Sequence, residues 1–181
     1  QALWGLSVFH QARNEHEEAL EMGGQLMALA EKSGDDGLRI MAHMAVGSPR
    51  HWKAEWRACL DHAEHAIALY DPARHRSLAP EYGEDPGVSS RIYASQSLWH
   101  LGFPDRAAAR ILEAVEVARQ RTHPFSLGYA LSFAAGAYYL RREREHARAW
   151  AEEAIAVSEE QDMRLWLGLG RAIRGWSLTG P

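Results

Sequence analysis

Apolar residues recur along this chain at intervals of three and four, which is the spacing of one face of an α-helix. The pattern is clearest between residues 85 and 122. Asp85 suits the N-cap of a first helix because its carboxylate accepts hydrogen bonds from free backbone N–H groups, and Pro86 fits the first helical position, where no N–H donor is needed. Gly102 can end that helix and Pro104 can begin the next one. The stretch therefore predicts a helix-turn-helix hairpin whose apolar faces need neighbours of the same kind.

The same spacing extends over the rest of the chain and predicts four hairpins and one single helix. Their expected positions are about residues 1–33, 36–70, 86–121, 124–160 and 163–178. Residues 71–85 show no clear period, so a long connection is expected there. Pro49 lies inside the helix expected from about residue 36 to residue 52 and removes one helical hydrogen bond, which predicts a kink or an early end.

Aligning the hairpins reveals an internal repeat. Each first helix ends near an apolar residue that is followed, seven residues later, by a small residue in the second helix. The four pairs are Ala12/Ala19, Trp52/Cys59, Leu101/Ala108 and Leu140/Ala147. A small residue at that position lets two helices cross closely, so Ala108 is expected to be buried. Four such coincidences predict an all-α fold, an α-solenoid of about four helix-turn-helix repeats that forms one domain over residues 1–181.

These repeats resemble tetratricopeptide (TPR) repeats, although their length of about 40 residues exceeds the usual unit of about 34. The alanine that this family carries early in its second helix is present at Ala19, Ala108 and Ala147, and Cys59 replaces it in the second repeat. The usual second-helix aromatic is absent. The resemblance implies a stack of helical hairpins with a concave groove.

A more specific resemblance covers about residues 68–176. The segments ALYDPARHRSLAPEYGEDPGV, LWHLGFPDRAAAR, THPFSLGYALSFAA and MRLWLGLGRAIRGWSL resemble the helical-repeat region of large bacterial signalling proteins. Such proteins join a class III adenylate/guanylate cyclase domain, or another effector, to an NTPase module and then to such repeats. The resemblance implies that this chain is an excised regulatory piece of a protein of that kind, without its catalytic or nucleotide-binding motifs.

Composition narrows the possible partners and the compartment. The formal net charge is −4, and glutamates are interleaved with the basic residues at positions 141–146, which argues against binding to nucleic acid. No apolar run approaches the roughly 18 residues that span a bilayer, so no membrane contact is expected. Cys59 is the single cysteine, which excludes an intrachain disulfide and favours the reducing cytoplasm.

No set of residues predicts catalysis, a metal site or a cofactor. His62 and His65 share one helix face, but no third ligand is evident, so a solvated face is the better interpretation. The glycines from Gly168 to Gly175 lack the preceding strand and the spacing of a phosphate-binding loop. Cys59 falls at a small-residue packing position, which predicts an inert buried thiol.

The candidate binding residues come from two columns of the first helices. In the repeat alignment, Trp4, Met44, Tyr93 and Ser132 are equivalent, as are Gln11, His51, His100 and Tyr139. In TPR arrays such positions line the concave groove, where aromatic and imidazole side chains would bind an apolar or aromatic partner. The alternative is that these side chains pack between adjacent hairpins, and both interpretations stay open from the sequence.

Three functions follow as hypotheses. The first is a non-catalytic regulatory module that presents its concave groove to a protein or peptide partner, or to an output domain of the same polypeptide. The second is a receptor domain that binds a small-molecule inducer, and the third, remote one is a stand-alone enzyme. The last helix should pack one side on the helix expected over about residues 143–160 and leave its other side exposed, so the isolated chain is expected to self-associate through that end. Its apolar stripe consists of Leu165, Trp166, Leu169, Ile173 and Trp176.

Overall fold

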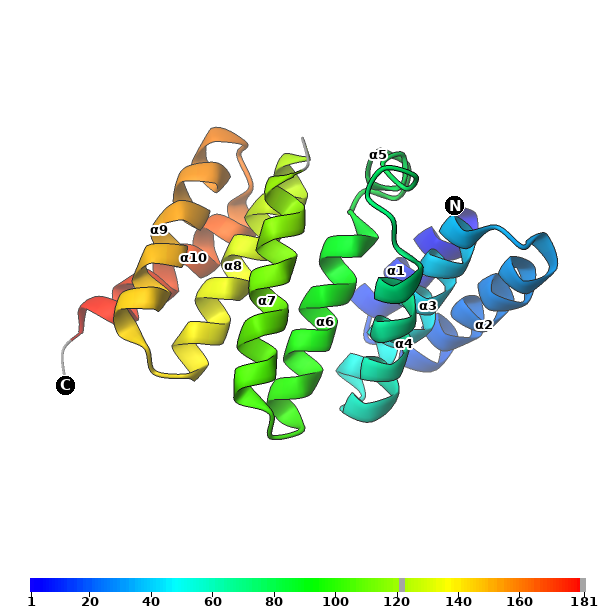
Figure 1. Ribbon diagram of the computed structural model, residues 1–181, viewed down its shortest axis with the longest axis horizontal. Helices are drawn as coiled ribbons and strands as arrows, with labels where there is room; N and C mark the ends of the chain where they lie inside the picture. Colours follow the sequence, from blue (N-terminus) through cyan, green and yellow to red (C-terminus); the bar gives the residue numbers. More distant parts are fainter. Residues whose placement is uncertain (121–122, 180–181) are drawn as a thin grey trace.

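The computed structural model describes residues 1–120 and 123–179, which form ten α-helices and no strand (Figure 1). The helices are α1 (Ala2–Ala12), α2 (His16–Ser33), α3 (Asp36–Trp52), α4 (Trp56–Leu69), α5 (Leu78–Tyr82), α6 (Pro86–His100), α7 (Pro104–Arg119), α8 (Pro124–Leu140), α9 (Arg144–Glu160) and α10 (Arg164–Leu178). The predicted all-α class and the four hairpins are confirmed, except that residue 121 lies outside the described residues.

The hairpins stack in chain order into a solenoid, with the two ends of the chain at opposite ends of the array (Figure 1). Each hairpin's second helix packs against the first helix of the next unit, as α2 does on α3 and α7 does on α8. Successive first helices also contact each other, whereas successive second helices are less closely packed. The array therefore curves with α1, α3, α6, α8 and α10 on its inner side.

Left-handed turn residues mark the repeat more accurately than the apolar pattern does. Asn14, Ala54, Gly102 and Arg142 have φ angles of 63°, 59°, 86° and 60° and lie between the two helices of their hairpins. Five residues after each turn stands a small side chain that is at most 2% exposed, and these four are Ala19, Cys59, Ala107 and Ala147. The third repeat is thus shifted by one residue from the predicted alignment, and the expectation that Ala108 fills this position is wrong.

The corrected alignment is supported by a hydrogen bond that recurs between repeats. Ser7 Oγ donates to the carbonyl oxygen of Ala19 at 3.3 Å, and Ser95 Oγ donates to that of Ala107 at 2.8 Å. Each serine lies seven residues before its turn, so the two bonds are equivalent. The sequence alignment missed this shift because Ala107, Ala108 and Ala109 are consecutive, and any of them satisfies a pattern that asks only for a small residue.

Substituting leucine at two neighbouring alanines tests the corrected alignment. Ala107→Leu is expected to lower the free energy of unfolding by about 1–3 kcal/mol, because its side chain has no room at the α6–α7 crossing. Ala108 is half-buried at the edge of a pocket, so Ala108→Leu should cost less than about 1 kcal/mol. Urea denaturation of both variants measures the difference, and equal losses would contradict the alignment.

The helix around Pro49 shows how one backbone break is accommodated. Helix α3 continues past Pro49 to Trp52, so the predicted early end is wrong. Pro49 has no N–H to donate to the carbonyl oxygen of Ala45, and that oxygen faces Gly23 of α2. A Cβ atom at Gly23 would lie 2.6 Å from it. Glycine at this position therefore allows α2 to pack directly over the carbonyl group that the proline leaves without its helical donor.

The connection between α4 and α6 is more ordered than its sequence suggests. It contains the short helix α5, which the pattern did not predict, and it ends at Asp85, which is 1% exposed. The Asp85 carboxylate accepts from the backbone N–H of Gly87 at 2.8 Å and from the Tyr70 hydroxyl at 3.0 Å. The backbone N–H of Asp85 donates to Ser126 Oγ at 3.0 Å. The predicted N-cap is thus confirmed, and it also ties α4 and α8 to the start of α6.

The last helix, α10, buries part of its apolar face on α8 and α9. Ile173 is 6% exposed and Trp166 and Trp176 are half-buried, whereas Leu165 is 73% exposed. The predicted packing of one side of this helix on the preceding one is confirmed, and self-association through the other side stays a prediction. Within the described residues, none of the helices has the length and apolar character needed to cross a membrane.

Candidate binding surface

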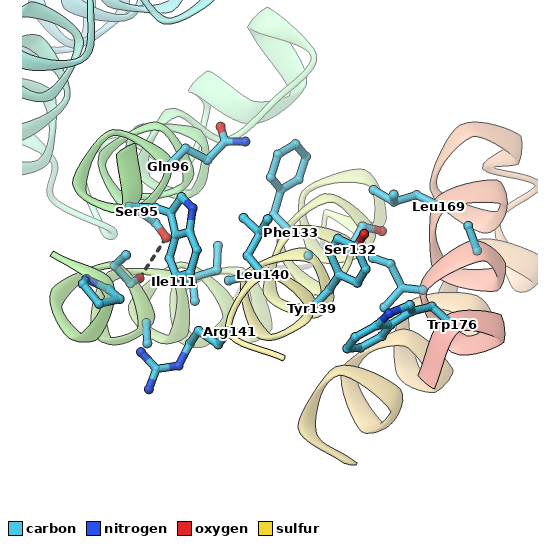
Figure 2. A pocket seen from close by; sticks show the side chains of 18 residues that line it. Ser95, Gln96, Ile111, Ser132, Phe133, Tyr139, Leu140, Arg141, Leu169 and Trp176 are labelled. Carbon is cyan, nitrogen blue, oxygen red and sulfur yellow. Dashed lines mark hydrogen bonds between the residues drawn. The ribbon is translucent and has the colours of Figure 1, made fainter. Parts of the chain in front are cut away.

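The inner side of the solenoid contains an apolar pocket of about 470 Å³ between α6, α7, α8 and α10. Figure 2 shows Gln96 on α6, Phe133 and Tyr139 on α8, and Leu169 and Trp176 on α10 around it. Consecutive first helices present these side chains because each contributes the face that points into the curve. We refer to this cavity as the apolar pocket.

Aromatic side chains give the apolar pocket its shape. The rings of Tyr139 and Trp176 meet edge to face, with centroids 4.6 Å apart and an interplanar angle of 78°. Trp99 of α6 and Phe133 of α8 line the same cavity and are half-buried. Rigid aromatic walls of this kind offer a large contact area at a small cost in conformational entropy.

Only a few polar groups reach the apolar pocket. The Gln96 amide forms no hydrogen bond with the described residues, and Ser132 Oγ is buried without a hydrogen-bond partner among them. Arg141 lies at the edge and is engaged by Asp105 at 3.0 Å and by Glu143 at 2.6 Å. The pocket is therefore nearly uncharged, and the Gln96 amide is a polar group that a ligand can reach.

A second, smaller pocket of about 260 Å³ lies between α1, α3 and the start of α6. Its walls include Trp4, Trp52 and Tyr93, and its polar groups come from Gln11, Ser48 and Glu84. The Trp4 indole N–H donates to the carbonyl oxygen of Tyr82 at 3.3 Å, which fixes that ring beside the end of α5. We refer to this cavity as the acidic pocket because Glu84 is its one charged group.

Burial dominates the electrostatics of the acidic pocket. The pKa of Glu84 is raised from 4.5 to about 7, chiefly by burial. The nearby Ser89 hydroxyl opposes this rise, and the negative charge of the adjacent Asp85 adds to it. Burial and the Glu84 charge likewise raise the pKa of the Tyr93 phenol. His51 lies behind Tyr93, and burial lowers its pKa to about 4, so its imidazole is neutral near pH 7.

Four of the seven candidate residues line these two pockets. Gln11 and Tyr93 face the acidic pocket, while Ser132 and Tyr139 line the apolar pocket. Their role in binding stays a prediction, and Ser132 is itself fully buried in the pocket wall.

The other three candidates lie elsewhere. Met44 and His51 are 2% and 7% exposed, so packing between hairpins is the correct interpretation for both side chains. His100 is exposed and stacks on Trp56, with ring centroids 4.0 Å apart, outside both pockets. The one-residue shift in the third repeat explains why His100 was misplaced. In the corrected alignment the residue equivalent to His51 is Trp99, which lines the apolar pocket.

Sequence reasoning missed Glu84 and Trp52. Glu84 falls in the aperiodic connection, where no repeat position identifies it. Trp52 was aligned only as the apolar residue near the end of its helix, and it is 60% exposed. The corrected alignment would have predicted that Trp52 is exposed. Its equivalent residues Ala12, His100 and Leu140 are all exposed.

A third histidine joins the pair that the sequence placed on one helix face. His43 of α3 lies with its Nδ1 atom 3.0 Å from that of His62, and its ring stacks on His65 at 5.0 Å. The pKa of His43 is lowered from 6.5 to about 4, chiefly by burial and in addition by the charges of His62 and His65. Over the described part of the chain, no three His, Cys, Asp or Glu residues are placed to hold a metal ion.

The single cysteine is buried as predicted. Cys59 is 0% exposed, and burial raises the pKa of its thiol to about 11. A thiol that is neither accessible nor ionised is a poor nucleophile, so the inert interpretation is confirmed.

Comparison with known proteins identifies the fold. No protein-family model matches the chain, and no curated protein matches its sequence. Among solved structures, the chain is similar to a Rap protein complexed with competence and sporulation factor, with a TM-score of 0.75 and 14% sequence identity. The similarity covers 92% of this chain and 45% of the Rap chain, so this chain spans less than half of that protein. The fold is therefore a TPR-like helical repeat.

Proposed function

We propose that this chain is a non-catalytic interaction module that holds an extended segment of a protein or peptide partner on its inner face. The apolar pocket is the observation that carries this proposal. A cavity of about 470 Å³ with aromatic walls suits one large apolar side chain together with the backbone around it. The amide of Gln96 can orient the segment.

The similar Rap structure supports the proposal at the level of the fold. That protein is complexed with competence and sporulation factor, so a protein that contains a solenoid of this architecture binds a partner. For the present chain, the proposed partner is a segment with a large apolar residue, and it is not identified with that factor.

The regulatory role is also part of the proposal. Binding on the inner face of a solenoid favours one curvature of the array and thereby biases the position of a domain attached to it. The resemblance to the repeat region of bacterial cyclase and NTPase fusions suggests such an output domain. Sequencing the complete gene tests this part, since a gene without an output domain on either side would contradict it.

Filling the apolar pocket tests the binding role. Gly136 lines the pocket, and a Cβ atom added there meets no atom within 4 Å, so Gly136→Phe should fold and block the cavity. Gly24→Phe is the matched control, because Gly24 is an exposed helical glycine of α2 with equally open surroundings. Peptides selected from a displayed random library on the parent chain should share a large apolar residue.

The two variants should then separate clearly. Gly136→Phe is expected to weaken binding of the selected peptides at least about tenfold, equivalent to about 1.4 kcal/mol, while Gly24→Phe leaves their affinity unchanged. Fluorescence anisotropy measures both. Peptides that bind both variants equally, or a library that yields no binder, would overturn the proposal.

The size of the apolar pocket favours a small-molecule receptor as the second candidate. Its volume falls within the roughly 300–1,000 Å³ typical of small-ligand sites, and its walls have the mixture of apolar surface and few polar groups that such sites share. A thermal-shift screen of apolar metabolites distinguishes the two functions. Stabilisation of the parent chain but not of Gly136→Phe, without any peptide binder, would favour the receptor.

A further inference from the structure

The acidic pocket contains a carboxyl group without a cation. Glu84 forms no ion pair with any residue that the structure describes, although its carboxyl lines an open cavity. The basic side chains that follow α1 and α3 are engaged elsewhere, since Arg13 pairs with Glu15 at 2.7 Å and Lys53 with Glu17 at 2.6 Å. A partly buried carboxylate of this kind costs free energy in the unbound protein.

The groups facing Glu84 do not supply the missing charge. Asp85 is negative, and the phenols of Tyr93 from α6 and Tyr129 from α8 are neutral because their pKa values are raised. His51 of α3 touches both Tyr93 and Trp52, with ring centroids 5.3 Å and 5.2 Å away, and is neutral near pH 7. The cation that would pair with Glu84 must therefore come from outside this part of the chain.

The walls of the pocket are also suited to a cation. The faces of Trp and Tyr rings carry negative electrostatic potential and attract ammonium and guanidinium groups. Trp4 is 7% exposed and held by its indole hydrogen bond, whereas Trp52 is 60% exposed at the mouth. Ser48 is 3% exposed, and its hydroxyl, close to the Tyr93 phenol, forms no hydrogen bond of normal geometry.

We propose that the acidic pocket binds the ammonium or guanidinium group of a basic side chain, with Glu84 as its counter-ion and Trp4, Trp52 and Tyr93 as its aromatic walls. The inference rests on the proposed function, since the partner that occupies the inner face carries this side chain. The volume of about 260 Å³ is below the roughly 300 Å³ at which small-ligand sites begin, which favours one side chain over a whole metabolite. The partner segment thus combines an apolar and a basic residue.

Single-residue probes test the pocket without knowledge of the partner. N-acetyl-arginine amide and N-acetyl-lysine amide are titrated into the full chain, and the indole resonance of Trp52 is followed by NMR. N-acetyl-citrulline amide is the control probe because it has nearly the same shape as the arginine derivative but no charge. We expect saturable shifts with at least one cationic probe and none with the citrulline derivative.

Two substitutions and the pH dependence sharpen the test. Glu84→Gln should weaken the cationic probe at least about tenfold, while Glu81→Gln, an exposed glutamate of the same connection, should leave it unchanged. Because the carboxyl must be ionised and its pKa is about 7, affinity should fall about tenfold between about pH 8 and about pH 6. Circular dichroism confirms that Glu84→Gln remains folded.

The outcomes separate this inference from the proposed function. No shift of Trp52 at the highest soluble probe concentration, equal binding of the citrulline derivative, or an unaffected Glu84→Gln variant would overturn the cation site. Gly136→Phe should leave the probe affinity unchanged, since it fills the other pocket. Selected peptides that need only their apolar residue would leave the proposed function standing and refute this inference.

Discussion

Asp85→Ala is expected to lower the free energy of unfolding by about 2–4 kcal/mol, because one side chain serves several buried groups. The substitution removes the N-cap of α6, whose loss typically costs about 1 kcal/mol. It also removes the hydrogen bond that the Tyr70 hydroxyl donates to the buried carboxylate at 3.0 Å, and a hydrogen bond to a charged group contributes about 1.5–3 kcal/mol. Urea denaturation monitored by circular dichroism measures the loss.

Two further variants identify the cause. Tyr70→Phe removes the same hydrogen bond but keeps the ring and the cap, so it should cost only part of the Asp85→Ala effect. Asp85→Asn can still accept from the Gly87 N–H and should recover part of the stability. Asp36→Ala is an unrelated carboxylate substitution in the first turn of α3, half-buried at most, and should cost less than about 1 kcal/mol. An Asp85→Ala loss no larger than that of Asp36→Ala would contradict the assignment.

The importance of Asp85 illustrates what the sequence could predict. Its capping role follows from local chemistry alone, since an aspartate before a proline and a run with helical spacing is a helix start. Its bonds to Tyr70 and Ser126 join segments 15 and 41 residues apart, and local patterns do not encode such contacts. Helix positions were therefore predictable, whereas the network that fixes the aperiodic connection was not.

The candidate site was predictable in its general location but not in its chemistry. First-helix columns point to the inner side of any TPR-like array, so Gln11, Ser132 and Tyr139 fall on pocket walls. The choice between wall and core depends on rotations of a few tens of degrees about each helix axis, which put His51 and Met44 inside. Glu84 belongs to no repeat position, because the connection that carries it interrupts the repeat.

The second large effect is a loss of stability between pH 6.5 and about pH 4. Burial is the main cause that lowers the pKa values of His43 and His51 from 6.5 to about 4 in the folded chain. The unfolded chain binds more protons at these two sites throughout that window, so stability falls as the pH falls. Protonated His51 would carry a donor on both ring nitrogens, and its Nδ1 atom is buried without a hydrogen-bond partner among the described residues. Its contribution is about 2–3 kcal/mol, and that of the half-buried His43 is smaller.

Glu84 acts in the opposite direction over an overlapping window. Its pKa is raised from 4.5 to about 7, so the folded state binds the extra proton and gains stability as the pH falls from 7 towards 4.5. The parent chain should therefore show a partly cancelled pH dependence. Glu84→Gln should be more stable than the parent at about pH 8 and should lose stability more steeply on acidification.

Removing the His51 titration isolates the histidine contribution. His51→Phe keeps an aromatic ring between Trp52, Trp56 and Tyr93, so the packing is largely retained while the proton-binding group is lost. Chemical denaturation at several pH values should show a shallower decline from pH 6.5 to about pH 4 than in the parent chain. His146→Gln, at a side chain that is 67% exposed, is the control and should leave the slope unchanged. If the stability of His51→Phe declines with falling pH as steeply as that of the parent chain, protonation of His51 does not contribute to the decline. The acid sensitivity would then arise elsewhere in the chain.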